Sequence, residues 1–359
     1  MLAAWLRLSL TPGLGDAGQR SLLAAFGLPD QIFAASRPAL ARVVGDRIAA
    51  VLVDADREAA VSEHLAWAAE PGHHVLTLAD SGYPRDLLAT ADPPTVLFAK
   101  GRAELLDRTG IAIVGARSAT AQGASNARAF AATLARSGLT IVSGLALGID
   151  AAAHEGGLEG EGGTIAVIGT GPDRIYPSRN QALARRIARE GLILSEFPLG
   201  TPARRHHFPR RNRILSGLAR GVLVVEAAVG SGSLITARLA AEQGREVFAI
   251  PGSIHSPLSR GCHRLIREGA KLVESAGDVL EELQWTARTT PPMTAPPPES
   301  GDTDEAGGVL AGLGYDPVDT DTLLQRSGLT ADALSAILLT MELDGRITRL
   351  PGGRFQRIQ

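Results

Sequence analysis

The sequence predicts a doubly wound α/β domain with a mostly parallel central sheet, preceded by a helical domain and followed by a winged helix. Two observations support the sheet. Between residues 75 and 283, short β-branched runs alternate with helical stretches, and these runs are apolar throughout instead of at every second position. Such runs are typical of strands buried on both faces, and their alternation with helices indicates parallel strands joined by right-handed crossovers.

Residues 1–75 form the first predicted domain. They are rich in Ala and Leu at helical spacing, interrupted by a Thr-Pro-Gly-Leu-Gly turn at 11–15. The positions expected on one face of the next helix are Leu22, Leu23, Phe26 and Leu28. The turn is similar to that of a helix-hairpin-helix, whose backbone amides can meet a phosphate. A small helical module with a tight turn fits the pattern equally well.

Residues 76–285 form the predicted central domain. Its strands are expected at 111–114, 140–142, 164–168, 192–194, 222–225 and 246–250. Ligands of an open parallel sheet bind beyond the carboxyl ends of the strands, near the point where the strand order reverses. The residues that directly follow each strand are therefore the first candidates for binding.

The remaining chain divides into a linker and a last domain. Residues 286–306 are rich in proline and acidic side chains, which favours an extended, solvated linker. In the predicted domain 307–359, a helix over 319–326 ends at Gly328 and a second helix covers 330–343. Runs at 347–350 and 354–358 then form a hairpin. Two helices followed by a hairpin is the order of a winged helix.

The overall charge balance hides one strongly basic segment. The chain has 36 basic and 38 acidic residues, a formal net charge of −2. Residues 201–220 nevertheless contain six arginines, two histidines and no acidic residue. A local patch of this kind can bind anions in a chain that is neutral overall.

Composition also excludes several protein classes. A single cysteine, Cys262, excludes a disulfide framework and a multi-cysteine metal site. No apolar run approaches the roughly 18 residues of a membrane span, and residues 1–10 lack the pattern of a secretory signal. We therefore expect a soluble, cytoplasmic protein that makes no membrane contact.

Loops rich in glycine and serine follow several of the predicted strands. They include Gly115-Ala116-Arg117, Ser143-Gly144, Gly169-Thr170-Gly171 and 230–233. Glycine lets a backbone approach a ligand closely, and amides at a helix N-terminus attract anions. Segment 230–233 leads into a helix and is the best phosphate cradle, and Arg117 is a candidate phosphate fork. The alternative for any one loop is a tight strand-to-helix turn.

The segment 204–215 is the strongest single signal. It combines arginines with Phe208, which fits the stacking and electrostatic requirements of single-stranded nucleic acid. The alternative is a solvated, basic start of a helix with Phe208 packed inward. No dinucleotide fingerprint and no Walker motif occurs in the sequence, so we expect no cofactor.

The chain offers little for catalysis. Cys262 and His263 are adjacent in sequence, which does not make a catalytic dyad, and the histidines lack metal-ligand spacing. Asp150 and His154 are one helical turn apart and are expected to form an i,i+4 pair. Glu226 follows a strand and could be a general acid or base, or could orient Arg213 or a backbone amide; we favour the orienting role.

Ordered motifs in the central domain resemble a known family. They are Gly115-Ala116-Arg117, Ser143-Gly144-Leu145-Ala146 with Gly148-Ile149-Asp150, Gly169-x-Gly171-x-Asp173 with Tyr176-Pro177, Phe208-Pro209-x-Arg211-Asn212-Arg213, Ser231-Gly232-Ser233, and Pro251-Gly252. This order resembles the DNA processing protein A (DprA/Smf) family over roughly residues 80–285. The flanking domains, a SAM-like helical one and a winged helix, are similar to those of longer members.

The resemblance implies a Rossmann-like fold and a protein that binds single-stranded DNA without sequence preference. Such a protein protects incoming DNA in natural transformation, loads the RecA recombinase, acts as a homodimer and has no catalytic turnover. It also implies phosphate contacts at Gly115, Arg117 and Arg205 and a base contact at Phe208; family members commonly have lysine at the Arg205 position. The candidate DNA contacts are Gly115, Arg117, Ser143, Gly144, Gly171, Arg205, Phe208, Arg211, Asn212, Arg213, Ser231, Gly232 and Ser233.

Two other functions remain as alternatives. A nucleotide-processing enzyme similar to phosphoribohydrolases would share the fold, but segment 230–237 lacks the glutamate that ends the corresponding motif of those enzymes. A transcription factor would use the winged helix to read DNA. Its second helix, 330–343, has no basic residue, whereas a helix that reads a DNA groove is basic. We therefore expect a structural or partner-binding role for that domain.

Overall fold

The computed structural model describes residues 1–54, 56–285, 304–314 and 316–358. Most of the predicted linker, 286–303, lies outside these residues. Within them, no helix is both long enough and apolar enough to cross a membrane.

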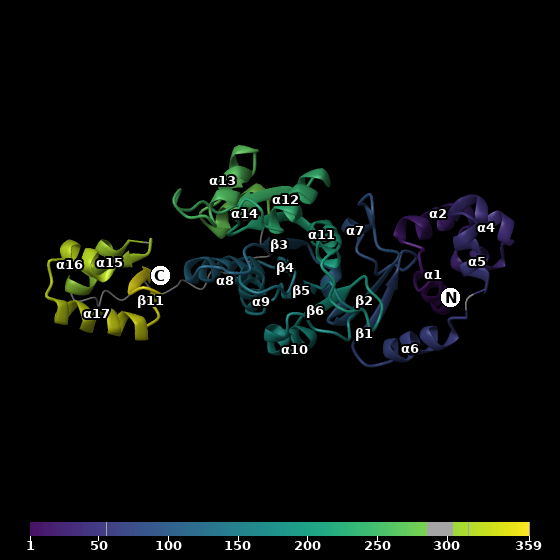
Figure 1. The fold of residues 1–359 in the computed structure, drawn as a ribbon, viewed down its shortest axis with the longest axis horizontal. Coiled ribbons are helices and arrows are strands. Elements are labelled where there is room, and N and C mark those ends of the chain that lie inside the picture. The colour runs from purple at the N-terminus through teal and green to yellow at the C-terminus, as the bar shows by residue number, and fades with distance from the viewer. Residues whose placement is uncertain (55, 286–303, 315, 359) are drawn as a thin grey trace.

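The chain opens with short helices that pack around a core of their own (Figure 1). They are α1 (Leu2–Ser9), α2 (Asp16–Phe26), α3 (Pro29–Ala34), α4 (Arg37–Val44) and α5 (Asp46–Asp54). The next helix, α6 (Glu58–Ala68), packs instead against α1 and strands of the central sheet. Leu22 is fully buried in the core that α1 to α5 share. The expectation for Leu28 is wrong: α2 ends at Phe26, Gly27 turns the chain with a φ of 87°, and Leu28 is 42% exposed at the start of α3.

The central sheet has nine strands among the described residues, in the order β1-β2-β6-β5-β4-β3-β7-β8-β9. The strands are β1 (His73–Thr77), β2 (Val96–Gly101), β3 (Gly110–Val114), β4 (Thr140–Ser143), β5 (Thr164–Val167), β6 (Leu192–Ser195), β7 (Ala219–Val224), β8 (Glu246–Ala249) and β9 (Lys271–Leu272). β1 and β2 are antiparallel to their neighbours. The strands that follow them across the sheet, β6-β5-β4-β3-β7-β8-β9, are parallel to one another. The expected mostly parallel, doubly wound sheet is confirmed.

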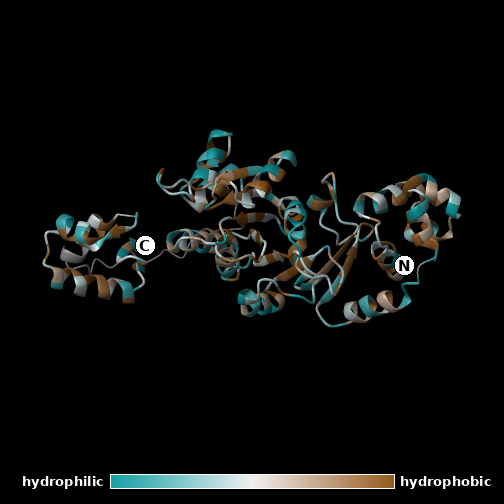
Figure 2. Ribbon diagram, viewed as in Figure 1, coloured by the Kyte–Doolittle hydropathy of each residue, from teal (hydrophilic) through white to brown (hydrophobic). Residues whose placement is uncertain are grey.

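Helices cover both faces of this sheet because each strand sends alternate apolar side chains to opposite sides. On β3, Ile111 and Ile113 face one core, and Ala112 and Val114 face the other. The first face is covered by α8 (Ala121–Arg136), α9 (Ile149–Gly157), α10 (Gln181–Glu190) and α14 (Ala276–Glu282). The second is covered by α7 (Arg85–Leu88), η1 (Ala103–Asp107), α11 (His207–Gly217), α12 (Ser233–Glu242) and α13 (Arg260–Arg267). Figure 2 shows the hydrophobic residues concentrated on the strands and on the inner sides of the helices.

The strand order reverses at β3. From β3 the chain builds outward through β4, β5 and β6, and it then returns to place β7 on the other side of β3. The register pairs Ala112 of β3 with Val142 of β4 and with Val222 of β7. The loops that leave β3 and β7 therefore start side by side, where an open parallel sheet binds its ligand.

The last domain is a small α/β unit built around a three-stranded sheet. It contains α15 (Asp304–Leu313), β10 (Val318–Asp319), α16 (Thr320–Ser327), α17 (Ala331–Leu343), β11 (Ile347–Leu350) and β12 (Arg354–Arg357). Asp319 and Thr330 cap the two predicted helices, and Gly328 ends α16 in the left-handed conformation. The winged-helix order is thus confirmed. The sequence analysis missed α15, which begins at residue 304 inside the predicted linker.

Candidate nucleic-acid interface

A pocket of about 690 Å³ lies beyond the carboxyl ends of β3 and β7. Five segments enclose it: the loop after β3, the loop from β4 into α9, the loop between β5 and η2 (Ser178–Asn180), the start of α11 and the start of α12. Of the predicted contacts, it brings together Gly115, Arg117, Arg205, Phe208, Arg211, Asn212, Ser231, Gly232 and Ser233. The reversal of strand order is therefore also the place where the predicted binding residues meet.

The loop after β3 carries Arg117 to the pocket. Arg117 is exposed, and its guanidinium carbon lies 5.7 Å from the centre of the Phe208 ring. Gly115 leaves no room for a side chain, since a Cβ there would lie 2.6 Å from Cγ1 of Ile149 and 2.9 Å from the carbonyl oxygen of Glu226. Glycine at 115 thus allows the loop to fold tightly over the sheet, with Arg117 at its outer end.

Glu226 holds this loop from the neighbouring strand. Its carboxylate accepts hydrogen bonds from the backbone amide of Thr120, at 3.0 Å, and from the Thr120 hydroxyl, at 2.5 Å. The same hydroxyl accepts the amide of Gly123 and caps α8. Of the roles considered for Glu226, the structure therefore favours the orientation of a backbone amide.

The start of α11 carries the basic and aromatic residues. Arg205 is exposed just before the helix, and Phe208 is half-buried in its first turn. The Phe208 ring lies over Gly169, where an added Cβ would be 3.0 Å from Cδ1 of the ring. Phe208 is thus neither packed fully inward nor free in solvent; it forms part of the pocket wall.

Arg211 forms the floor of the pocket. Its side chain is buried and donates a hydrogen bond to the carbonyl oxygen of Gly144 at 2.9 Å. Burial lowers the pKa of Arg211 to about 10, which still leaves the guanidinium charged at neutral pH. Asp150, also on the pocket wall, is buried nearby, and burial raises its pKa. The floor therefore carries a buried positive charge with a carboxyl group beside it.

The expected i,i+4 pair of Asp150 and His154 is wrong. Within residues 140–165, all of which the structure describes, each side chain bonds to the loop after β4 instead. Asp150 accepts the amides of Gly144 and Ala146, and Nε2 of His154 accepts the amide of Leu145. Burial lowers the pKa of His154 to about 3, so it is neutral. Both side chains fix the loop that leaves β4.

Segment 231–233 forms the opposite wall. α12 begins at Ser233, and the hydroxyls of Ser231 and Ser233 lie 2.7 Å apart. Asn212 of α11 donates to the carbonyl oxygen of Gly232 at 3.4 Å and connects the two helix starts. Ser231, Gly232 and Ser233 thus line the same pocket as Arg117 and Arg205, while the amides of Ser231, Leu234 and Ile235 are held by carbonyl oxygens within residues 228–232.

Arg213 was predicted as a DNA contact, but it does not line the pocket. Its side chain is 11% exposed and points away from the pocket into a cluster of carboxylates. It pairs with Asp16 of α2 at 2.9 Å, with Asp92 at 2.8 Å and with Glu196 at 2.7 Å. Because three carboxylates already surround its charge, Arg213 connects the helical domain to α11.

Three further predicted contacts lie beneath the surface. Ser143 is fully buried and donates to the carbonyl oxygen of Ile113, which ties β4 to β3. Gly144 is covered by Arg211, since a Cβ there would lie 1.8 Å from Nη1 of that residue. Gly171 is buried, and its amide donates to the carbonyl oxygen of Thr201. These residues shape the site without lining it, whereas Tyr176, which sequence reasoning missed, does line it.

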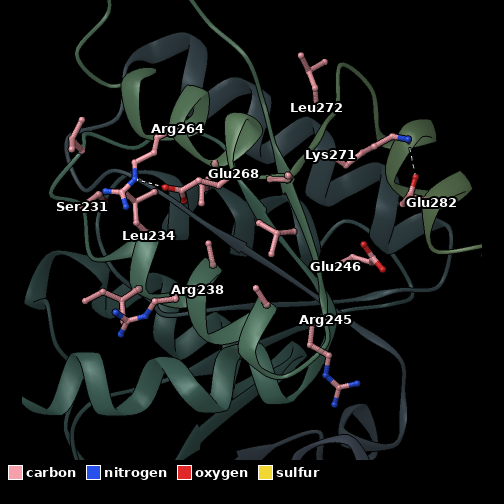
Figure 3. Close-up of a pocket in the computed structure, with 18 of the residues that line it drawn as sticks. Ser231, Leu234, Arg238, Arg245, Glu246, Arg264, Glu268, Lys271, Leu272 and Glu282 are labelled. Atoms are coloured by element: carbon pink, nitrogen blue, oxygen red, sulfur yellow. Dashed lines mark hydrogen bonds and ion pairs between the residues drawn. The ribbon is translucent and has the colours of Figure 1, made fainter.

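A larger pocket of about 870 Å³ lies between α12, α13 and the edge of the sheet (Figure 3). Its charges are matched in pairs: Arg264 with Glu268 at 2.8 Å, and Lys271 with Glu282 at 2.9 Å. Of the predicted contacts, only Ser231 reaches it. Because its cations already have carboxylate partners, it is less suited to phosphates than the smaller pocket.

Comparison with known proteins identifies the family of this chain. The family model described as DNA recombination-mediator protein A matches residues 74–284, and a DprA winged helix domain model matches residues 293–353. Protein Smf of Escherichia coli K12 is 43% identical over 298 residues, which cover 82% of this chain and 80% of that protein.

Two solved structures are also similar. DNA processing protein A from Streptococcus pneumoniae superposes with a TM-score of 0.70 at 42% identity, covering 79% of this chain and 98% of that one. The protein of the same name from Helicobacter pylori superposes with a TM-score of 0.54 at 32% identity, covering 58% of this chain and 95% of that one. The fold, the ordered motifs and these relatives together place the chain in the DNA recombination-mediator protein A family, also named DprA or Smf.

Proposed function

We propose that this protein binds single-stranded DNA without base preference in the pocket beyond β3 and β7, and that it processes DNA taken up in natural transformation. The observation that carries the proposal is the convergence of Arg117, Arg205, Phe208 and the start of α12 on one pocket. Relatives support it: the Helicobacter pylori structure is described by its single-stranded DNA binding mode, and a Streptococcus pneumoniae relative is named DNA processing protein DprA.

Phosphates and bases have separate partners in this pocket. Arg117 and Arg205 are exposed cations that neutralise phosphates, and the hydroxyls of Ser231 and Ser233 line the opposite wall. Phe208 offers a ring for stacking, which every base can use because every base has a π-face. In a duplex, each base is already stacked between its neighbours, so we expect single strands to bind more tightly.

We further infer that the protein acts in the cytoplasm as a homodimer, hands its DNA to the RecA recombinase and turns over no substrate. The family membership supports these inferences. Light scattering of the purified protein measures the dimer. RecA filament formation on DNA coated with this protein measures the handover, and an assay for base release from nucleoside monophosphates measures turnover.

The decisive experiment is a fluorescence-anisotropy titration of labelled oligo-dT and of duplex DNA at two salt concentrations. We expect salt-sensitive binding that prefers the single strand. Arg117→Ala should weaken it and lower the salt slope by about 0.7, the value for one lost phosphate contact on a single strand. Arg136→Ala is the matched control, since Arg136 is an exposed arginine in the last turn of α8. No binding of the single strand at low salt would refute the proposal.

A further inference from the structure

One aromatic side chain on the rim of the pocket, that of Tyr176, is largely exposed. Tyr176 is 50% exposed, although aromatic side chains gain stability from burial. It lies between the end of β5 and η2, on a segment with two exposed arginines, Arg174 and Arg179. A large exposed ring between two cations has the composition of a surface that binds single-stranded nucleic acid.

Tyr176 also lies next to Phe208. The two ring centres are 5.5 Å apart and the ring planes are inclined by 40°. A base inserted between two rings needs about 7 Å, twice the 3.5 Å contact distance of carbon atoms. The gap between the rings is therefore too narrow for a base, so one base cannot stack on both rings at once. Each ring is available to a different base.

We propose that Tyr176 is a second base-stacking residue, so that this pocket holds two bases of one strand, one on Phe208 and one on Tyr176. The inference rests on the proposed binding of single-stranded DNA. It extends the strand beyond Arg117 and Phe208 toward the segment that contains Arg174 and Arg179, both exposed, of which Arg174 lies 3.6 Å from Asp173. Tyr176 thereby accounts for part of the affinity that the arginines do not supply.

The test compares a base-bearing strand with one that has no bases. Tyr176→Leu keeps an apolar side chain but removes the ring, and Tyr176→Phe keeps the ring. Each variant is titrated with oligo-dT and with an abasic oligonucleotide of equal length and charge. We expect Tyr176→Leu to weaken oligo-dT binding about 5- to 150-fold, the equivalent of one lost base stack. It should leave abasic binding and the salt slope unchanged, and Tyr176→Phe should bind both strands like the wild-type protein.

The other outcomes overturn the inference in recognisable ways. If Tyr176→Leu binds oligo-dT as the wild type does, or loses both strands equally, Tyr176 does not stack on a base. The parallel variant Phe208→Leu shows whether the pocket itself stacks bases: a loss for Phe208→Leu without one for Tyr176→Leu refutes only this inference. Failure of the wild-type protein to bind any single strand refutes the proposed function instead. Thermal melting confirms that both Tyr176 variants are folded.

Discussion

Replacing Arg213 with methionine tests whether this arginine stabilises the fold or binds a phosphate. The substitution leaves Glu196 without its closest partner, and the Glu196 side chain is only 1% exposed. Removing one member of a buried ion pair costs about 3–5 kcal/mol, because the remaining charge is buried without compensation. The contact with Asp92 adds little to this figure, since that carboxylate is 50% exposed and screened by water. We therefore expect Arg213→Met to lower the free energy of unfolding by about 3–5 kcal/mol.

The assay is urea unfolding followed by circular dichroism. Arg186→Met, which breaks an exposed i,i+4 pair with Glu190, is the matched control and should leave the free energy of unfolding nearly unchanged. The double variant Arg213→Met with Glu196→Gln should regain part of the loss, since the buried charge of Glu196 is removed and Asp16 keeps Arg210 as its partner. Wild-type stability combined with weaker binding of single-stranded DNA would refute this reasoning and return Arg213 to the phosphate contacts.

The stability loss of the Arg213→Met variant should depend on pH. Burial already raises the pKa of Glu196, and removal of Arg213 raises it further. A carboxyl group whose pKa is higher in the folded state stabilises the fold at low pH, and this contribution disappears as the pH rises through the folded pKa. The stability loss of Arg213→Met should therefore be smaller at pH 5 than at pH 8.

Three further predictions concern buried polar groups. Thr120→Val removes the cap of α8 and the hydroxyl bond to Glu226, and should lower the unfolding free energy by about 2–4 kcal/mol in urea, whereas Thr120→Ser retains both interactions. Because burial lowers the pKa of His154 from 6.5 to about 3, only the unfolded chain takes up its proton near pH 5. Acidification from pH 6.5 to pH 4 should thus cost about 3 kcal/mol, and His154→Gln should lose this part of the pH slope. Burial raises the pKa of Cys262 to about 12, so at pH 8 its thiol should react with a disulfide reagent at least about 100-fold more slowly in the folded protein than in urea.

Continuous apolar runs were enough to predict the six parallel strands from β3 to β8. Of the strands that were missed, β2 has a comparable apolar run at 96–99, whereas β1 and β9 have a weaker signal. β1 is buried only at its two ends, and β9 consists of two exposed residues, Lys271 and Leu272. Edge strands and short strands gain their structure from pairing with the rest of the sheet, so their own sequence does not show it.

The pocket was located from the sequence because strand ends can be found without a structure. The direction of each side chain could not be predicted in the same way. Arg213 turns from the pocket because the fold places Asp16 and Asp92 beside it, and these residues are more than a hundred positions away in sequence. Glu226 meets Thr120 for a similar reason, since their contact depends on β7 lying next to β3. Which side chains become partners therefore depends on the order of the strands in the sheet.

The position of the pocket at the reversal of strand order affects how this protein can be divided or recombined. Arg117 comes from the first half of the sheet, and Phe208 and the start of α12 come from the second half. Neither half carries a complete site, and Glu226 of the second half also holds the loop of the first. A chimera with a relative, joined between β6 and α11, would pair strands and loops of different ancestry at the junction of β3 and β7, in the pocket and in both cores. Exchange of segments between relatives therefore preserves the pocket only when the loop after β3 and the residues from α11 to α12 come from the same protein.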